Sequence, residues 1–408
     1  MRRFISILLS CILAVSITGC QLVPTSSSPA QPTVLRLLLR EGTYTDVVKH
    51  SLETFEQEHN VICDVVALSE SKLHDSIAIS NTSGESFDLC QVSGSWMAEF
   101  TEKGLLENLS AHGYVFDSDI IPRTTEISYY QGKIYLIPYL GNVSVLFYNK
   151  ALLEDSGHTP EDLTTLETIY ETCKTASDNG HIGFMYRGDT NVIVDFMPFL
   201  ISYGGWWIDD QHQPTVTTPE FKAALGYYKK LTDTGKCSTK EDIINAISRG
   251  HGAMSIGWPA WYLPTDSSPA SYCELNGKVA DGHECHNANI YGIWALGISA
   301  NSPHKDLSYE LLTYLMDPTV QKNSMEVGGV PCRYSCLRDS NVLSRYPQYD
   351  SICAALENGT YRPFMANWSD FEKVLTPHII DVLQNRSDID TAMEAAQNEL
   401  KELMGQNQ

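Results

Sequence analysis

The sequence predicts an α/β protein built from two domains, and three observations support this. At 408 residues the chain is long enough for two domains that each bury a core. Its hydrophobic content of 43% and charged content of 19% are typical of globular proteins. Short apolar runs alternate with helical patterns, which indicates mostly parallel, buried sheets flanked by helices.

Residues 1–19 are predicted to be a signal peptide. Arg2 and Arg3 are followed by the apolar run 4–17, which is too short to span a membrane comfortably. Ile17-Thr18-Gly19-Cys20 is similar to a bacterial lipobox, which implies cleavage before Cys20 and lipid on its thiol. The alternative is an ordinary signal peptide with a cysteine there by chance. Residues 20–33 then hold the lipidated cysteine and a Ser/Pro-rich tether with nothing to bury.

The charge of the chain narrows the choice of partner. Loss of residues 1–19, which contain two arginines and no acid, takes the formal charge from −22 to −24. Such acidity argues against nucleic acid or anionic lipid as a partner. A solvated acidic surface explains it without a cationic ligand.

The first predicted sheet supplies three candidate ligand-binding residues. Strands are expected at 34–39, 61–68 and 87–92, with an amphipathic helix over 46–59. Ligands of open α/β sheets bind at the carboxyl ends of strands. The residues at these ends are Glu41, Ser71 and Trp96. Each has a surface-loop alternative, which we favour for Ser71.

Residues 131–150 organise the middle of the chain. Runs 134–137 and 143–148 are predicted strands, the first ended by Pro138, and Asn149 is a plausible helix N-cap. The polar joint 139–142 between them is either a plain β-turn or a passage from one domain to the other. Tyr139 and Asn142 lie in this joint and are further candidates.

Two aromatic groups follow in the second half. Trp206 and Trp207 come after a pair of glycines, and Trp258, Trp261 and Tyr262 follow a predicted strand beginning near residue 252. An aromatic ring covers the C–H face of a pyranose while polar groups bond its hydroxyls. These residues are therefore candidate sugar contacts, with burial in a core as the alternative.

The cysteines leave several chemistries open. The insertion 266–289 contains Cys273, His283, Cys285 and His286. A Cys273–Cys285 disulfide suits an exported protein, free thiols are an alternative, and the spacing fits no compact zinc pattern. Cys332 and Cys336 are close enough in sequence for a tight disulfide, although reduced thiols fit equally well. We expect no metal and no cofactor.

The C-terminal third is predicted to return to the first domain and then to finish in helices. A strand over 289–299 carries Trp294, which either touches the ligand or fills a hinge. Helices are expected over 307–316 and 319–326. The tail 363–404 is expected to be helical with a break at Pro377.

The order of these motifs resembles one family along almost the whole mature chain. Residues 132–157 contain G-K-I-Y-x-I-P and L-F-Y-N-K-x-L-L-x-x-S-G, which are similar to the interlobe passage of family 1 extracellular solute-binding proteins. Gly250-x-x-Ala-Met and Gly328-x-x-Pro-x-Arg333 match further family motifs. The resemblance implies a periplasmic-binding-protein-like fold of two lobes. Lobe 1 would be 34–139 plus 290–335, and lobe 2 would be 140–289 plus 336–408. Arg333 would bond a ligand hydroxyl or fix the hinge, and we favour the hinge.

The function implied is capture of a mono- or oligosaccharide in the interlobe cleft for an ABC permease. The protein would be a monomer, anchored by lipid to the outer face of the cytoplasmic membrane. Alternatives keep the fold with a peptide, polyamine or other non-sugar ligand, or make the protein a surface glycosidase or an adhesion or sensory protein. Motifs of serine hydrolases, phosphate loops and zinc proteases are absent from the sequence, so an enzyme is not expected. Glu41 and Asp88 are the only carboxylate pair we considered for glycoside hydrolysis.

Overall fold

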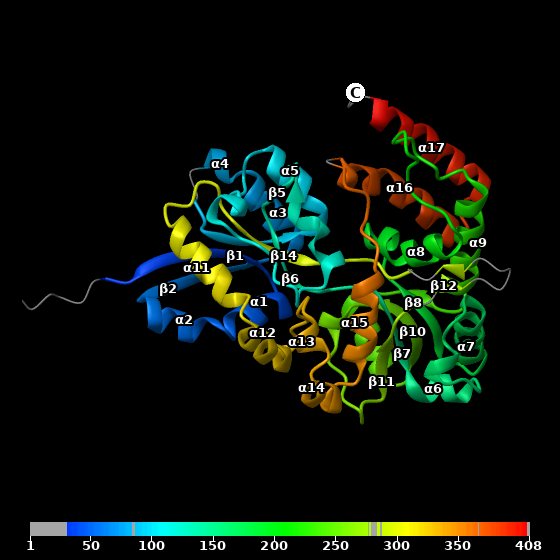
Figure 1. Cartoon of the computed structure of the whole chain (residues 1–408). Coiled ribbons are helices and arrows are strands. Elements are labelled where there is room, and N and C mark those ends of the chain that lie inside the picture. Colours follow the sequence, from blue (N-terminus) through cyan, green and yellow to red (C-terminus); the bar gives the residue numbers. More distant parts are fainter. Residues whose placement is uncertain are drawn as a thin grey trace, which may run out of the picture.

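The computed structural model describes residues 31–83, 86–275, 277–278, 284–285, 288–365 and 367–405. It has two lobes, each built around a five-stranded sheet with helices on its faces (Figure 1). The predicted signal peptide, Cys20 and most of the tether lie outside the described residues. No helix within these residues is long and apolar enough to cross a membrane.

The first sheet has the strand order β2-β1-β3-β14-β6. β1 pairs in parallel with β2 and β3, whereas β14 runs antiparallel to β3 and β6. The strands are β1 (Thr33–Arg40), β2 (Val61–Leu68), β3 (Leu89–Ser93), β6 (Ile137–Leu140) and β14 (Trp294–Ile298). The helices of this lobe are α1 (Thr43–Lys49), α2 (Leu52–His59), α3 (Glu70–Ala78), α4 (Ser80–Ser83), α5 (Met97–Glu102), α11 (Lys305–Leu315) and α12 (Pro318–Ser324).

The second sheet has the order β11-β7-β10-β8-β9. β10 and β9 are parallel to β8, and β7 runs antiparallel to β10 and β11. The strands are β7 (Val145–Asn149), β8 (Ile182–Tyr186), β9 (Lys236–Cys237), β10 (Gly252–Gly257) and β11 (Ala270–Cys273). The helices are α6 (Lys150–Asp155), α7 (Leu166–Asp178), α8 (Asn191–Ser202), α9 (Pro219–Thr232), α10 (Lys240–Ser248), α16 (Trp368–Leu383) and α17 (Ile389–Gly405).

Smaller elements complete the lobes. α13 (Tyr334–Leu337), α14 (Ser340–Arg345) and α15 (Gln348–Asn358) lie below the junction in Figure 1. Short pairs are β4 (Tyr129–Tyr130) with β5 (Lys133–Ile134), and β12 (Gly277–Lys278) with β13 (Glu284–Cys285). The 3₁₀ helices are η1 (Gly94–Trp96), η2 (Leu109–His112), η3 (Pro122–Ser128), η4 (Pro160–Asp162), η5 (Pro259–Trp261) and η6 (Met325–Val327).

Both sheets are mixed, whereas the sequence analysis expected mostly parallel ones. β14 enters the first sheet from the second lobe, so it starts at the edge where the parallel strands end. β7 enters the second sheet from the first lobe in the same way. The antiparallel pairs therefore follow from chain crossings that connect the lobes without a helix.

Several element boundaries differ from the prediction. Residues 46–59 form two helices, because α1 ends at Lys49 and α2 begins at Leu52. Pro138 lies inside β6, an edge strand, where the missing N–H costs no ladder bond. α16 continues through Pro377. Asn149 caps α6 as predicted, since its side chain accepts a bond from the Leu152 N–H at 3.0 Å.

The crossings between the lobes form a paired, buried hinge. The segments around Val143 and Tyr291 form an antiparallel bridge. Ser144 N–H donates to Ile290 O at 2.7 Å, and Gly292 N–H donates to Asn142 O at 2.9 Å. One apolar core extends from the first sheet past this hinge to Phe147 of the second. A second core fills the opposite face of that sheet.

Candidate ligand-binding cleft

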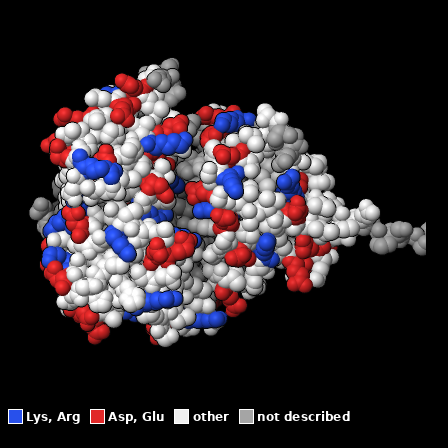
Figure 2. All heavy atoms as spheres, turned by 180° about the vertical axis from the view of Figure 1, so that it is seen from behind, with Lys and Arg blue, Asp and Glu red and all other residues white. Residues whose placement is uncertain are grey.

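The two sheets face each other with the edges at which their parallel strands end. The carboxyl ends of β1, β2 and β3 meet the start of β14 at one edge, where Trp294 pairs with Ser93. In the second sheet, the ends of β8 and β10 meet the start of β7, where Gly257 pairs with Val145. Figure 2 shows a groove between the two lobes. This groove is the candidate site.

An aromatic cluster of Tyr44, Trp96 and Trp294 forms the first-lobe wall. The ring centroids of Trp96 and Trp294 are 5.3 Å apart and nearly perpendicular, and those of Tyr44 and Trp294 are 5.4 Å apart. The Arg40 guanidinium lies 5.7 Å from the ring centroids of both Tyr44 and Trp294. Trp96 is half-buried, so it keeps part of its ring accessible. The cluster offers the apolar surface that a sugar ring requires.

Asn142 places polar groups beside this cluster. It is 4% exposed, and its Nδ2 donates to the Tyr44 hydroxyl at 3.3 Å. Its Oδ1 is buried and has no hydrogen-bond partner within the described part of the chain. Burial raises the pKa of Tyr44 to about 12, so its hydroxyl stays protonated at neutral pH. An unpaired buried acceptor is costly, and a ligand hydroxyl would satisfy it.

The second-lobe wall is built on Arg187, the residue after β8. Its guanidinium donates to both carboxylate oxygens of Asp195 in α8, and to Asn191 Oδ1 at 2.8 Å. It also lies 5.0 Å from the Trp261 ring centroid. Burial raises the pKa of the Asp195 carboxyl, while the Arg187 charge opposes that rise. The pair thus holds a cation and an aromatic face in fixed positions.

The two walls of the groove are close enough for charges on one to affect groups on the other. The charge of Arg187 acts on the Tyr44 phenol and lowers its pKa against the effect of burial. Burial lowers the pKa of Lys240, the first residue of α10. Its neighbour Glu241 opposes this effect, and Arg40 and Glu41 of the first lobe have smaller, opposite effects on the same pKa. Glu41 is exposed at the end of β1 and so belongs to the rim of the cleft.

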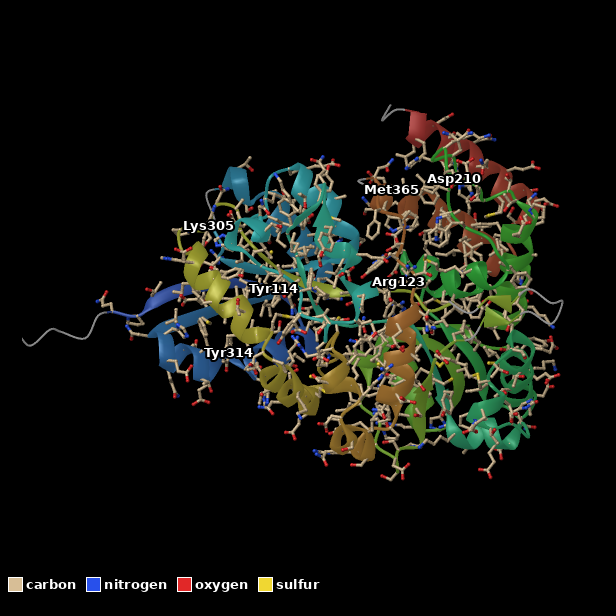
Figure 3. The ribbon with its side chains drawn as sticks, viewed as in Figure 1. Tyr114, Arg123, Asp210, Lys305, Tyr314 and Met365 are labelled. Atoms are coloured by element: carbon tan, nitrogen blue, oxygen red, sulfur yellow. The ribbon has the colours of Figure 1, made fainter. Side chains whose placement is uncertain are left out.

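The groove continues to a second end near residues 361–365. Here Arg362 pairs with Glu372 of α16 at 3.2 Å. Burial raises the pKa of Glu372, and the negative charge of Glu70 in the first lobe raises it slightly further. A small pocket at this end has Ser95 and Ile293 on one side and Phe364 on the other. Figure 3 places Met365 on the side of the second lobe that faces the first. Arg123 lies where the lobes join, with its Nε donating to Gly359 O at 3.2 Å.

The structure brings five of the predicted site residues to the cleft: Glu41, Trp96, Asn142, Trp261 and Trp294. Ser71 is exposed in the first turn of α3, next to Glu70. Tyr262 is half-buried and its ring lies 5.6 Å from that of Phe147, in the core near the hinge. Ligand contact by Ser71 and Tyr262 stays a prediction.

Three candidate ligand contacts lie buried away from the groove in the structure. Trp207 is fully buried among Phe196, Phe221 and Trp368 in the second-lobe core. Tyr139 is 2% exposed within the first-lobe core. Arg333 is 3% exposed because it bonds Asp117 at 2.6 Å, Asp119 at 3.0 Å and Gln321 at 3.1 Å. Arg333 therefore fixes the segment after α12 to the first lobe, a structural role of the kind that the sequence analysis favoured for it.

Trp206 and Trp258 occupy structural positions as well. Trp206 is half-buried against the second-lobe core, in a loop that runs to Asp210 beside α16 and α17 (Figure 3). Trp258 is 6% exposed and packs on the hinge at Gly292. A Cβ at Gly292 would lie 2.5 Å from the Trp258 ring, so the hinge requires glycine there.

The cysteines whose side chains the structure describes are not joined in disulfides. Cys332 and Cys336 are both free thiols, and Cys336 Sγ donates to Pro318 O at 3.5 Å, which agrees with the reduced alternative and not with a disulfide between them. Cys273 is also free, so no Cys273–Cys285 disulfide is formed. The side chain of Cys285 and residues His283 and His286 lie outside the described residues. No metal-binding group of His, Cys, Asp or Glu occurs among the residues described.

The carboxylate pair considered for hydrolysis is separated by the fold. Asp88 lies beside Arg36 at the start of β3, accepting its N–H at 2.8 Å and the Ser302 hydroxyl at 2.6 Å. Glu41 follows the opposite end of β1. It is five residues beyond Arg36, the residue level with Asp88, so the backbones of Glu41 and Asp88 are about 16 Å apart along the strands. Glycosidase carboxyl groups lie within about 10 Å of each other. This pair therefore cannot perform that reaction.

Comparison with known families identifies the class. Residues 51–350 match the model of the bacterial extracellular solute-binding protein family, and the chain belongs to that family. It is thus an exported binding protein.

Individual relatives share little sequence identity with this chain but align with it over most of their length. The chain is 22% identical to the galactooligosaccharide-binding protein of Bacillus subtilis, over 98% of both chains. It is 21% identical to a probable amino-acid ABC transporter periplasmic-binding protein of Sinorhizobium fredii, over 79% of this chain and 78% of that one. An ABC transporter solute-binding protein of Agrobacterium radiobacter, solved with ribitol, superposes with a TM-score of 0.80 at 20% identity, covering 92% of this chain and 100% of that one.

Sequence reasoning missed Arg40, Tyr44, Arg187 and Lys240. Arg40 and Tyr44 flank Glu41, so a search of all polar and aromatic residues after the first strand would have found them. Arg187 likewise follows a strand end. Lys240 opens a helix and has no local signal that marks it as a cleft residue.

Proposed function

We propose that the protein captures a saccharide between its lobes and delivers it to an ABC permease. The observation that carries this proposal is the aromatic cluster, in which Trp294 is buried and Trp96 is partly exposed, beside the unpaired Asn142 Oδ1, with Trp261 and Arg187 on the opposite wall. Apolar ring faces next to fixed hydrogen-bonding groups match a sugar, which is apolar on its faces and polar at its edge.

The comparisons support the same ligand class. One relative is named for galactooligosaccharide binding, and a structural neighbour holds ribitol, a sugar alcohol. A relative named for amino-acid transport favours the alternative of a non-sugar solute. The aromatic cluster favours the saccharide, because an amino acid offers no extended C–H face to stack on it.

Closure and anchoring complete the proposal. The lobes, 34–139 plus 290–335 and 140–289 plus 336–408, would close by rotation at the paired crossings, with each lobe contributing contacts. The separation of the two sheets between β6 and β7 supports this division. Lipid on Cys20 and the tether to residue 33 would hold a monomer at the outer face of the membrane, near its permease.

A thermal-shift screen tests the proposal. Protein starting at Thr33 would be heated with sugars, sugar alcohols, oligosaccharides, amino acids, peptides and polyamines. A ligand at about 100 times its Kd stabilises by roughly 2.7 kcal/mol, which raises Tm visibly. A saccharide hit without turnover of that sugar supports capture. A hit confined to amino acids, peptides or polyamines contradicts the saccharide, and hydrolysis products would indicate an enzyme.

A further inference from the structure

The aromatic cluster of the first lobe forms a row with Trp294 in the middle. The Trp294 ring centroid lies 5.4 Å from that of Tyr44 and 5.3 Å from that of Trp96. Tyr44 belongs to α1 and Trp96 leads into α5, and these two helices lie on opposite faces of the first sheet (Figure 1). Trp294 starts β14 at the edge of that sheet, between the two faces. The row therefore crosses the sheet edge and has a Tyr44 end and a Trp96 end.

The lobes meet at the Tyr44 end of the row. Cα atoms of α1 come within 8 Å of Cα atoms of η5, the turn of the second lobe that carries Trp261. Trp261 and Tyr44 pack against the same hydrophobic core. The Arg187 guanidinium lies 5.0 Å from the Trp261 ring centroid, and its ion pair with Asp195 keeps it there. Backbones this close leave no room for a sugar ring between them, so the groove is closed at this end.

The Trp96 end of the row leads into the pocket between Ser95 and Phe364, which belong to opposite lobes. Phe364 is 49% exposed. Its ring centroid lies 5.3 Å from that of Tyr361, which is 9% exposed and lies 4.4 Å from the ring of Tyr291 in the crossing strand. Phe364 is therefore an exposed aromatic ring on a rigid base, and the apolar face of a sugar would cover it. Because solvent reaches this ring, the groove is open at this end.

Polar groups beside Phe364 suit the hydroxyls of a sugar. Arg362 lines the same pocket and pairs with Glu372 at 3.2 Å, with their side chains 16% and 12% exposed. On the first-lobe side, the hydroxyl oxygens of Ser93 and Ser95 lie 3.0 Å apart. An apolar ring next to fixed charged and hydroxyl groups repeats the chemistry of the aromatic cluster. The pocket and the row adjoin each other, since Ser95 comes directly before the last tryptophan of the row.

We propose that the ligand is a linear oligosaccharide that binds by one end of its chain. Its terminal unit would lie at the closed end, beside Tyr44 and Trp261, and a later unit would stack on Phe364 at the open end. This inference rests on the proposed function and narrows it from saccharides in general to oligosaccharides with a free chain end. A longer chain would leave the groove past Phe364.

A chain-length series tests the inference in the whole mature protein. Calorimetry measures affinity for glucose, maltose, maltotriose and maltohexaose, and for the corresponding members of the cello-, xylo- and galacto-oligosaccharide series. In the series that binds, an oligosaccharide should bind about tenfold or more tightly than its monosaccharide, because only the longer chain reaches Phe364.

Blocking the chain ends tests the closed and open ends of the groove separately. The oligosaccharide that binds most tightly is labelled with a fluorophore either at its reducing end or at its non-reducing end. One labelled form should lose affinity about a hundredfold or more, because the fluorophore cannot enter beside Tyr44 and Trp261, while the other should bind within about threefold of the unlabelled chain. Tolerance of both labels would show that neither end is closed. Loss of affinity with both would show that the chain does not project past Phe364, and either result overturns the inference.

Two substitutions locate the unit at the open end. Phe364→Ala should weaken oligosaccharide binding about tenfold and change monosaccharide binding less than about threefold, whereas Phe364→Tyr keeps the ring and should retain both affinities. Tyr129→Ala is the matched control, because Tyr129 is 44% exposed in β4 of the first lobe and lies against Phe116, outside the pocket. It should leave both affinities unchanged. An oligosaccharide affinity that survives Phe364→Ala overturns the assignment of a sugar unit to this pocket.

The outcomes separate this inference from the proposed function. A monosaccharide that binds as tightly as its oligosaccharides overturns the inference and leaves saccharide capture standing. Binding of no saccharide, with a hit among amino acids, peptides or polyamines in the thermal screen, overturns both. The labelled chains are tested on the unmodified protein, so they decide the question even if Phe364→Ala does not fold.

Discussion

Trp294 in the first lobe and Trp207 in the second are 5% and 0% exposed, yet their surroundings differ. Trp294 is beside Arg40 and Trp96 at the sheet edge that faces the groove. Trp207 is enclosed by Phe196, Phe221 and Trp368, and its Nε1 has no partner in the described chain. The same residue type thus belongs to a candidate site in one lobe and to a core in the other. The difference is that Trp294 lies at a sheet edge that faces the groove and Trp207 does not.

Replacing Trp207 should have the largest effect on stability. Trp207→Ala leaves a cavity in the second-lobe core and should lower the free energy of unfolding by about 3–5 kcal/mol. Trp207→Phe keeps the ring contacts and removes the unpaired N–H, so it should cost much less. Urea unfolding measures both. A loss under 1 kcal/mol for Trp207→Ala would show that this core repacks.

The hinge can be tested at Gly292, where the crossing strand meets Trp258. Gly292→Ala places a Cβ 2.5 Å from the Trp258 ring and should cost about 1–3 kcal/mol through overpacking. In a Trp258→Leu background the same change should cost less, because the clashing ring is gone. Equal costs in both backgrounds would mean that the two residues do not oppose each other.

Two half-buried tryptophans, one in each lobe, test whether the cleft and the core use this residue type differently. Trp96→Ala should weaken saccharide binding tenfold or more, about 1.4 kcal/mol, because it removes a ring from the first-lobe cluster. Trp206→Ala removes a ring of similar burial from the second-lobe core and should leave affinity within threefold. Calorimetry with a ligand from the screen measures both. The reverse pattern would move the site to the 203–210 loop.

The smallest expected effect on stability concerns His74, whose ring packs against Trp96 of the aromatic cluster. Its Nε2 lies 2.8 Å from Glu99 Oε2, and its ring is 5.1 Å from that of Trp96. The bond to Glu99 raises the pKa of His74 above its usual 6.5, and the bond to His74 lowers that of Glu99 from 4.5 to about 2. The raised histidine pKa gives stability that is complete below pH 6.5 and lost as pH rises through the folded value. The lowered carboxyl pKa gives stability present above pH 4.5 and lost toward pH 2.

His74→Gln should therefore lower stability by up to about 1 kcal/mol between pH 4.5 and 6.5. The difference from the unmodified protein should shrink at higher pH. Thermal unfolding across pH 4 to 9 measures it. A difference that grows with pH would show that the imidazole is stabilised in its neutral form instead.

Much of the fold could be predicted because its signals are local. Apolar runs predicted the strands near 34–39 and 61–68, and Asn149 marked a helix start that the structure confirms. Prolines were less reliable guides, because their cost depends on whether the missing N–H had a partner. Pro138 lies in an edge strand and Pro377 lies within a helix.

The sequence by itself determined the alternation of strands and helices and the family. The tertiary structure alone decided which aromatic residues face the groove. Tyr44, Trp96 and Trp294 are separated by long stretches of chain and meet only because β1, β3 and β14 share one sheet edge. Local periodicity reports which side of an element is buried, but a site between lobes depends on contacts that no local pattern encodes.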